Sequence, residues 1–302
     1  MQTLKEIQAL LDQAGARPQK RLAQSFLIDL NLMGKLLEIA ELRGNETILE
    51  VGAGTGSLTE ELLRATPAGR VIAVEIDRGL AGLLRNRFAE QLSIRSNLTL
   101  IEGDVLGGKN RISPVVLTAA GPRANLVANL PYSIATPMVA ECMLESWRSL
   151  RGEGVRFDRL TFTVQHEVAE RFAAAPGRRA GRAYGQVSVI LGLLGRVKLG
   201  PVIPPTAFWP QPKVSSRIVR VDFDAHTAGQ LHDAVILRAV LNMVFTQRRK
   251  HISSTARARG AVFGPRVFSE ALEKAGVNPT ARAGELPPEA YRDLANVLCD
   301  LK

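Results

Sequence analysis

Hydrophobic positions follow two alternating patterns along the first two-thirds of the chain. Short runs that are apolar on both faces, such as TILEV and RVIAVEID, are typical of strands buried between two layers. Between them lie segments such as LTEELLRA and RGLAGLLRNRFAEQL, in which apolar residues recur at helical spacing. The alternation of strands and helices predicts an α/β domain with a mostly parallel sheet covered by helices.

The pattern changes after the helix predicted at MVAECMLESW. Three strands in succession are predicted over RLTFTVQHEV, GQVSVILGLLGRVKLG and SSRIVRVDF. The last two are joined by the proline-rich PVIPPTAFWPQPK, which favours an antiparallel return over another crossover. From about Ala225 onward the pattern is helical only. We therefore place a domain boundary near Asp224, which gives an α/β domain over residues 1–224 and a small all-α domain over residues 225–302.

The composition is that of a globular protein with a basic surface. Of its 302 residues, 46% are hydrophobic, which is enough to fill a core, and 39 Lys and Arg against 29 Asp and Glu give a formal charge of +10. This excess favours polyanions such as nucleic acid or a membrane surface. Charge alone is almost equally compatible with a solvated basic surface.

Several kinds of site and location are disfavoured. Cys142 and Cys299 form no CxxC pair and have no His at ligand spacing, so neither a disulfide framework nor a zinc site is indicated. The N-terminal MQTLKEIQALLDQAG is neither the apolar part of a signal peptide nor a membrane span. We expect a soluble, cytoplasmic protein that uses no metal.

A glycine-rich turn follows the first buried strand. In EVGAGTG, Gly52, Gly54 and Gly56 let the backbone approach a ligand closely where the next helix begins. Glu75 ends the next strand and is placed to accept hydrogen bonds from two ribose hydroxyls; Asp104 follows the third strand and is placed to accept from an adenine amino group. A dinucleotide would also suit such a turn, but the spacing GxGxG lacks the third glycine position of GxGxxG.

These motifs resemble those of the class I methyltransferases that use S-adenosyl-L-methionine. The resemblance implies that the glycine loop abuts the methionine part of the cofactor, that Glu75 holds the ribose and that Asp104 reads the adenine. Ile76 and Val105, beside these acids, belong to the predicted cofactor site. The resemblance also implies a Rossmann-like domain with a mostly parallel seven-stranded sheet that contains an antiparallel strand. A nicotinamide dehydrogenase is the competing interpretation, but it gives the later motif NLPY no role.

The stretch NLPYSIATP begins with Asn129, at the end of the fourth predicted strand. The exocyclic amine of adenine is a poor nucleophile because its lone pair is delocalised into the ring. The side-chain carbonyl of Asn129 and the backbone carbonyl of Leu130 or Pro131 can accept the two N–H groups and leave the lone pair aimed at a methyl sulfonium. Tyr132 can clamp the base by stacking. The four-residue pattern is a signature of amino-methyltransferases and predicts these roles. Asn129 is also expected to contact the cofactor. No dedicated general base is expected for the reaction.

Further segments extend the resemblance to nearly the whole chain, which is similar to the KsgA type of ribosomal RNA adenine dimethyltransferases. This resemblance implies dimethylation of the N6 amines of two adjacent adenosines near the 3′ end of small-subunit (16S) rRNA, during late subunit assembly. The segments that carry it, in the family's order, are RLAQSFLID, EVGAGTGSLTEELL, VIAVEIDRGLA, GDVL, NLPYSIATP, VQHEVAERF, YGQVSVI, IPPTAFWPQPKVSSRIVR and VFTQRRK.

By the same resemblance, Gln24, Ser25 and Leu27 close over the cofactor. The family usually shows GQNFL here, so Ala23 replaces a glycine and Ser25 an asparagine. The Ser25 hydroxyl can keep part of the side-chain contact, and a backbone contact from Leu27 would be unaffected. Ser133 departs from the common NLPYN form, and because it lies outside the four-residue core we expect altered loop packing and retained chemistry.

The substrate side is predicted from aromatic and basic residues. Methylation of a base inside folded RNA requires that the base is splayed out and held between planar side chains. Phe208 aligns with the aromatic of the family's FxPxPKV segment and is expected to supply the second stacking face, with core packing as the alternative. Basic clusters are expected to contact rRNA phosphates, chiefly Arg248, Arg249 and Lys250. The clusters are Arg17, Lys20 and Arg21; Arg178, Arg179 and Arg182; and Arg248, Arg249, Lys250, Arg257 and Arg259.

Two other functions stay open at this point. An Erm-like methyltransferase acting on large-subunit rRNA shares the cofactor motifs and an NLPY-like site, although the helical C-terminal part and FWPQPKVSS favour the small-subunit enzyme. A ribosome-assembly or transcription factor that binds nucleic acid with little catalysis belongs to another class. The presence of Gly52, Glu75, Asp104 and Asn129 argues against it. No dimer motif is evident, so we expect a monomer.

Overall fold

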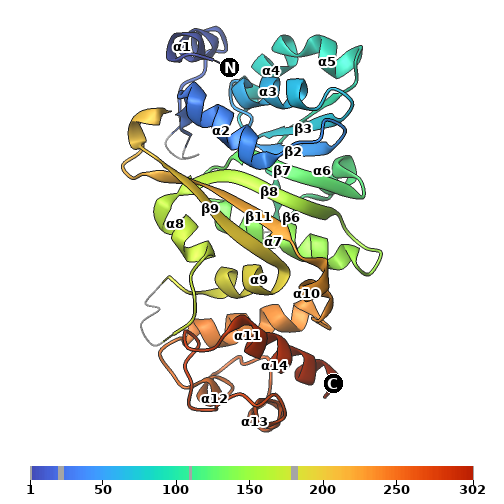
Figure 1. The fold of residues 1–302 in the computed structure, drawn as a ribbon, viewed down its shortest axis with the longest axis vertical. Helices are drawn as coiled ribbons and strands as arrows, with labels where there is room; N and C mark the ends of the chain where they lie inside the picture. The colour runs from blue at the N-terminus through green and yellow to red at the C-terminus, as the bar shows by residue number, and fades with distance from the viewer. Residues whose placement is uncertain (1, 20–23, 109–110, 178–182, 302) are drawn as a thin grey trace. The chain divides into compact units, whose positions relative to one another are not determined.

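The computed structural model describes residues 2–19, 24–108, 111–177 and 183–301. Contacts group the chain into two compact units, the first formed by residues 1–169 and 198–222 and the second by residues 170–197 and 223–302 (Figure 1). After Asp222 the chain passes from the first unit to the second for the last time, two residues before the boundary predicted near Asp224. Residues 170–197 also belong to the second unit, which the sequence pattern did not indicate. That these units are separate domains stays a prediction.

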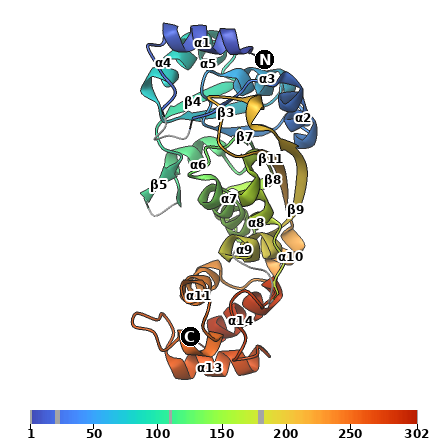
Figure 2. The same cartoon turned by 90° about the vertical axis from the view of Figure 1, so that its left-hand side faces the viewer.

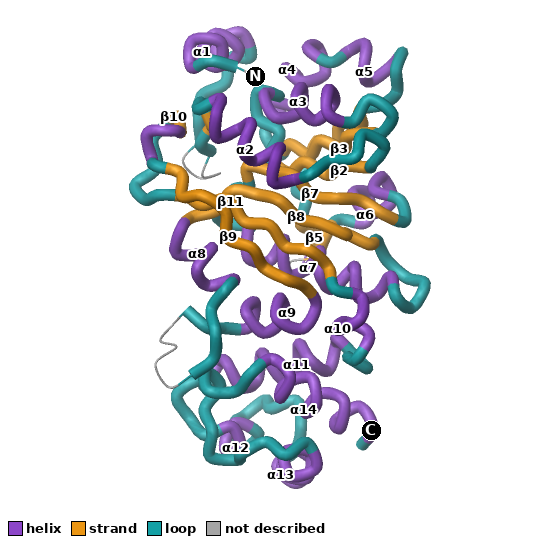
Figure 3. The backbone as a smooth tube through the Cα atoms, viewed as in Figure 1, coloured by secondary structure: helices purple, strands orange, loops and turns teal. Residues whose placement is uncertain are grey.

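A seven-stranded sheet forms the centre of the first unit (Figure 3). Its order is β4-β3-β2-β7-β8-β11-β9; the pairs from β4 to β8 are parallel, and β11 runs antiparallel to β8. The predicted mostly parallel sheet with an antiparallel strand is confirmed. The strands are β2 (Thr47–Val51), β3 (Arg70–Glu75), β4 (Leu98–Glu102), β7 (Arg123–Asn129), β8 (Arg156–Gln165), β9 (Gly195–Ile203) and β11 (Ser216–Phe223).

Helices cover both faces of this sheet. α2 (Leu30–Ala40), α3 (Ser57–Ala65) and α4 (Arg78–Arg87) share one hydrophobic cluster with strand residues two positions apart, as expected for one face of a sheet. α6 (Pro114–Ala120) contacts β2 and β3, and α7 (Ala135–Ser149) contacts β8. Figure 2 shows α7 on the opposite side of the sheet from α2. The α/β architecture predicted from the alternating pattern is therefore confirmed.

Aspartate side chains fix the start of two of these helices. Asp29 accepts hydrogen bonds from the backbone N–H groups of the first turn of α2, and Asp77 does the same for α4. A capping box between Thr3 and Glu6 begins α1.

The remaining elements outside the second unit's own helices are α1 (Leu4–Gln13), β1 (Phe26–Leu27), α5 (Ala89–Ser93), β5 (Leu106–Gly107), β6 (Arg111–Ile112), α8 (His166–Phe172), the 3₁₀ helix Pro205–Ala207 and β10 (Phe208–Trp209).

The second unit is built from helices around a core that contains aromatic rings. Phe245 lies between Tyr184 and Tyr291, with ring centroids 6.3 and 5.8 Å away. The two tyrosine hydroxyls donate to backbone carbonyls, so these buried polar groups are satisfied. The helices are α9 (Gln186–Leu194), α10 (Ala225–Gly229), α11 (Ala234–Thr246), α12 (Ile252–Thr255), α13 (Pro265–Lys274) and α14 (Pro288–Asp300).

One predicted strand is partly wrong. In GQVSVILGLLGRVKLG, the residues from Gln186 to Leu194 form helix α9, and the strand β9 begins at Gly195. Seven of the nine helix residues are buried, so the run is apolar nearly all round and its periodicity does not distinguish a buried helix from a buried strand. The β-branched residues Val187, Val189 and Ile190 favoured the wrong choice.

Candidate active site

A cavity opens at the carboxyl ends of β2, β3 and β7, where an open α/β sheet binds its ligands. Its empty volume, including the part open to solvent, is about 880 Å³. Segments far apart in the sequence meet here because parallel strands end at the same edge of the sheet. The predicted residues that line it are Gln24, Ser25, Leu27, Gly52, Gly54, Glu75, Ile76, Asn129, Leu130, Pro131 and Tyr132.

The glycine loop is shaped for close approach. Gly52 has φ +77°, and a Cβ at this position would lie 3.2 Å from Cγ of Pro131. Gly54 has φ +61°, and a Cβ there would lie 3.0 Å from the ring of Phe26. Both conformations favour glycine. A side chain at either position would press against Pro131 or Phe26, so glycine lets the loop pack closely against the NLPY motif and the N-terminal segment at the edge of the cavity.

Gly56 packs differently from the other two glycines of the loop. Its φ is +81°, and a Cβ would lie 2.6 Å from the ring of Phe88 and 2.8 Å from Leu84. It is not among the described residues that line the cavity. Gly56 therefore allows the loop to turn and to pack against α4, while a contact with the cofactor stays a prediction.

Glu75 is buried at the floor of the cavity, with 3% of its surface exposed. Oε2 accepts a hydrogen bond from the backbone N–H of Gly54 at 2.8 Å, and Oε1 accepts one from Asp77 at 2.9 Å. Burial raises the pKa of this carboxyl, and the two backbone donors act in the opposite direction. Because a carboxylate oxygen can accept more than one hydrogen bond, Glu75 both fixes the glycine loop and keeps acceptor capacity for a ligand.

Asp104 and Val105 are not among the described residues that line the cavity. Asp104 is exposed, and its Oδ1 accepts from the backbone N–H of Leu106 at 2.9 Å, whereas Val105 is 3% exposed. The preceding Gly103 donates its N–H to the carbonyl of Glu75 at 2.9 Å, which ties this turn to the end of β3. Their contact with adenine stays a prediction.

Both polar groups of the Asn129 side-chain amide are hydrogen-bonded. Nδ2 donates to the backbone carbonyl of Ser25 at 2.8 Å, and the hydroxyl of Thr163 donates to Oδ1. The backbone carbonyl of Pro131 accepts from the N–H of Ile134 at 3.1 Å. Because a carbonyl oxygen can accept a second hydrogen bond, the choice between the backbone carbonyls of Leu130 and Pro131 as acceptor for the substrate amine stays open.

Tyr132 lies at the mouth of the cavity with an intermediate exposure. Its hydroxyl is hydrogen-bonded to Oγ of Ser216 at 2.7 Å, and burial raises the pKa of its phenol. The contact anchors the far end of the ring while leaving the ring beside the cavity. This position is compatible with the predicted stacking role, which stays a prediction.

Phe208 is packed in the hydrophobic core, which was the alternative to base stacking in the sequence analysis. It is 2% exposed, belongs to the hydrophobic cluster under α2 and pairs with Leu27 in the two-stranded sheet β1–β10. The neighbouring Trp209 stacks on Phe26 at a centroid distance of 6.4 Å. A base could reach the ring of Phe208 only if this strand pair moved, so its stacking role stays a prediction that this structure does not favour.

The Ser25 hydroxyl donates to the backbone carbonyl of Pro210 at 2.7 Å. This hydrogen bond joins the N-terminal segment to the loop at residues 208–211, so the hydroxyl of Ser25 is bonded within the protein. Oε1 of Gln24 accepts from the N–H of Gln19 at 2.9 Å. The predicted closing segment is thus tied down on both sides, and the cofactor contacts of these side chains stay predictions. Ala23 lies outside the described residues.

Several residues at the site escaped the sequence analysis. Gln2, 3% exposed, donates from Nε2 to the carbonyl of Thr55 at 3.1 Å and accepts from the Thr55 hydroxyl at 2.6 Å, so the N-terminal arm holds the glycine loop. Glu50 lines the cavity and accepts from the Thr59 hydroxyl at 2.6 Å; burial raises the pKa of Glu50 to about 8. None of these side chains carries a motif, and their partners follow only from the folded chain.

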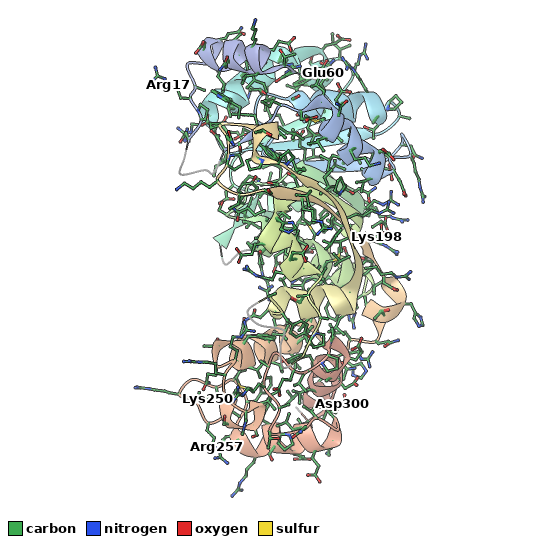
Figure 4. All side chains as sticks on the ribbon, turned by 60° about the vertical axis from the view of Figure 1, so that its left-hand side comes forward. Arg17, Glu60, Lys198, Lys250, Arg257 and Asp300 are labelled. Carbon is green, nitrogen blue, oxygen red and sulfur yellow. The ribbon has the colours of Figure 1, made fainter. Side chains whose placement is uncertain are left out.

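The predicted basic cluster at residues 248–259 of the second unit contains one half-buried arginine and four exposed cations. Arg248 is half-buried and donates to the carbonyl of Tyr184 at 3.2 Å, whereas Arg249 and Lys250 are exposed. Figure 4 shows Lys250 and Arg257 on the same side of this unit. Arg17 is exposed in the first unit. Lys20, Arg21, Arg178, Arg179 and Arg182, which were predicted to add to the basic surface, lie outside the described residues.

The described part of the chain shows neither a metal-binding cluster nor a membrane-spanning helix. No group of three or more His, Cys, Asp or Glu side chains there is placed to hold a metal ion. None of the helices it contains is long and apolar enough to span a bilayer.

Comparison with known proteins gives concordant matches. Residues 15–300 match the family model described as ribosomal RNA adenine dimethylase. The chain is 33% identical to the ribosomal RNA small subunit methyltransferase A of Moorella thermoacetica, over 96% of each protein, and 36% identical to that of Rhodococcus opacus, over 96% of this chain and 92% of the relative.

Solved structures share the fold. The 23S rRNA methyltransferase ErmE matches with a TM-score of 0.58 and 25% identity, over 91% of this chain and 99% of that one. A dimethyladenosine transferase from Plasmodium falciparum matches with a TM-score of 0.66 and 21% identity, over 88% and 94%. These matches support the Rossmann-like methyltransferase fold predicted from the sequence.

Proposed function

The chain belongs to the ribosomal RNA adenine dimethylase family, and from this we propose that its cavity dimethylates adenosines of small-subunit rRNA. The chain is an rRNA adenine dimethyltransferase that takes its methyl groups from S-adenosyl-L-methionine. The finer proposal is that it acts on the N6 amines of two adjacent adenosines near the 3′ end of the 16S rRNA, late in subunit assembly. The observation that carries the proposed methyl transfer is that Glu75, the glycine loop and Asn129 line one cavity, and the names of the relatives support the choice of small-subunit rRNA.

The residues present fit the cofactor. Glu75 supplies a buried acceptor for ribose hydroxyls, and Gly52 and Gly54 line the cavity without a side chain, so a ligand can approach their backbone. Ile76, 47% exposed beside Glu75, offers an apolar surface for a base. When bound, S-adenosylmethionine supplies an activated methyl group on a sulfonium. We assign its binding to these residues and to Phe26, which covers the loop.

The NLPY motif would orient the substrate amine. Oδ1 of Asn129 can accept a second hydrogen bond besides that from Thr163. The backbone carbonyl of Leu130 or Pro131 provides another acceptor. Two such acceptors hold both N–H groups of an amine and turn its lone pair out of conjugation with the ring. Since the methyl donor is already activated, orientation and fixed dipoles account for most of the rate enhancement.

For rRNA, we propose that exposed cations of the second unit supply phosphate contacts. Arg249, Lys250, Arg257 and Arg259 are all exposed, and none of the residues in TQRRKHISSTARARG is acidic. Such contacts position RNA without reading its sequence. We further propose that the protein acts as a monomer in the cytoplasm on the assembling small subunit.

An Erm-like activity on large-subunit rRNA is the second candidate, favoured by the similarity to ErmE. The curated relatives at 33% and 36% identity are small-subunit enzymes, which favours the first proposal. A mainly non-catalytic assembly factor is the third, and the lining of the cavity by Glu75 and Asn129 argues against it.

The test is transfer of labelled methyl groups from S-adenosylmethionine to unmethylated small subunits and, in parallel, to unmethylated large-subunit RNA. Mass analysis of the digested nucleosides then identifies the product. Dimethyladenosine in the small subunit is the expected result. Label in the large-subunit RNA alone would replace the proposal by the Erm-like activity, and tight RNA binding without label would leave the assembly role.

A further inference from the structure

The side-chain amide of Asn129 depends on the strand beside it. β7 and β8 are parallel and pair so that Asn129 lies next to Thr163. Neighbours in register point to the same face of a sheet, and this brings the Thr163 hydroxyl to Oδ1 of Asn129. Thr163 is 0% exposed and is not among the described residues that line the cavity, so any effect on a substrate would pass through Asn129.

The two hydrogen bonds of Asn129 determine which way its amide faces. The backbone carbonyl of Ser25 can only accept, so the group that faces it at 2.8 Å must be the NH₂. Oδ1 is then directed to Thr163, whose hydroxyl can donate. If that hydroxyl were absent, the amide would be held at one end and could rotate about its Cβ–Cγ bond. The acceptor needed by the amine would then be present for part of the time only.

We infer that Thr163 is a positioning residue, which holds the Asn129 carbonyl in the orientation that accepts the substrate amine. The inference deepens the proposed function and rests on it. One neutral hydrogen bond is involved, and such bonds contribute about 0.5–1.5 kcal/mol. The expected loss is therefore about three- to tenfold in turnover. The loss should appear in kcat, because the hydrogen bond aligns the Asn129 carbonyl with the substrate amine for methyl transfer and does not contribute to the binding of RNA or cofactor.

Thr161 offers a matched control. It is on the same strand and the same face, two residues from Thr163, and it is also 0% exposed. Among the residues that the structure describes, none forms a hydrogen bond with its hydroxyl. Replacement of either threonine by valine changes the same atoms in the same layer of the sheet, so the difference between the two variants isolates the contact with Asn129.

The experiment compares Thr163→Val, Thr161→Val and Thr163→Ser in methyl transfer to unmethylated small subunits, with cofactor affinity measured by calorimetry. Thr163→Val should lower kcat by about three- to tenfold, with KM and cofactor affinity changed by less than about twofold. Thr161→Val should match the wild type, and Thr163→Ser should restore most of the rate. Equal kcat for the two valine variants would overturn the inference. If Thr163→Val does not fold, Thr163→Ser is compared with Thr163→Ala; equal rates would overturn it as well.

A second readout does not depend on activity. In ¹⁵N-labelled protein, the two side-chain amide protons of Asn129 are assigned by their loss in Asn129→Ala. They should shift in Thr163→Val and stay in place in Thr161→Val. Unshifted resonances would contradict the contact itself. If the wild type methylates neither RNA, the proposed function fails while this measurement still decides the contact; if it is active and the valine variants agree, the inference alone fails.

Discussion

Two regions hold the residues proposed to function in opposite ways: the cofactor edge, which is the edge of the sheet at Glu75 and Asn129 where we propose that the cofactor binds, and the basic segment of the second unit, residues 246–260. At the cofactor edge, Glu75 and Asn129 each make two hydrogen bonds to fixed partners. In the basic segment, Arg249 and Lys250 are exposed on a surface without nearby acidic residues in the sequence. The first arrangement suits chemistry that needs one geometry, and the second suits attraction to a charged backbone that needs only enough charge. Single substitutions should therefore have large effects at the first region and small, salt-dependent effects at the second.

The largest effect is expected from Asn129→Ala. It removes the side-chain acceptor that orients the amine, an interaction needed mainly in the transition state, so methyl transfer should fall by about 10²–10³-fold. Cofactor affinity should change by no more than a few fold. Single-turnover transfer and calorimetry measure the two quantities, and full activity would remove Asn129 from the mechanism.

Glu75→Ala should separate binding from chemistry. The carboxylate anchors the loop at Gly54 and is proposed to accept from the ribose, and hydrogen bonds to charged groups contribute about 1.5–3 kcal/mol. We expect cofactor affinity to fall about ten- to hundredfold in a calorimetric titration. An exposed glutamate, as in Glu153→Ala, serves as the control. Unchanged affinity in Glu75→Ala would argue against the ribose contact.

Glu50 tests what burial does to a charge at the cofactor edge. Its pKa is raised from 4.5 to about 8 because it is buried, so the folded protein binds this proton more tightly than the unfolded chain. The free energy of unfolding should therefore decline as pH rises from about 4.5 to about 8. Without cofactor, Glu50→Gln should melt close to the wild type at pH 5 and a few degrees above it at pH 8.5. Parallel melting curves at all pH values would contradict the raised pKa.

Lys250→Ala should have the smallest effect. One lost phosphate contact lowers RNA affinity by about two- to threefold at physiological salt and reduces the slope of log affinity against log salt by about 0.9. Lys274 on α13 is the control, since it is paired with Glu270 at 2.7 Å. Salt titrations of RNA binding measure both. A slope that is unchanged in Lys250→Ala, or reduced equally in Lys274→Ala, would remove Lys250 from the RNA surface.

The same contrast explains how far the sequence could predict this molecule. Gly52, Glu75 and Asn129 could be predicted to meet because each follows a strand of a parallel sheet, and the carboxyl ends of such strands share one edge. Thr163 and Ser216 could not, because their contacts with Asn129 and Tyr132 depend on the register of β7, β8 and β11. Sequence patterns predict the order of elements, whereas register appears only in the folded sheet.

The wrong prediction for residues 186–194 has a physical cause as well. The helix α9 was predicted as a strand because an apolar run that is buried nearly all round loses its periodicity. Phe208 is a different case: its stacking role stays a prediction, although the strand pair with Leu27 places its ring in the core, which was the alternative interpretation. Aromatic residues serve both purposes, and the sequence does not distinguish them.

The most direct test of the central claim is reverse transcription along small-subunit RNA after reaction with the wild type and with Asn129→Ala. Dimethylation removes both N–H groups of the adenine amine and blocks base pairing, so the polymerase stops at each product. Two consecutive stops near the 3′ end with the wild type, absent with Asn129→Ala, are the predicted result. Stops elsewhere, or equal stops with both proteins, would contradict the claim that this site dimethylates two adjacent adenosines.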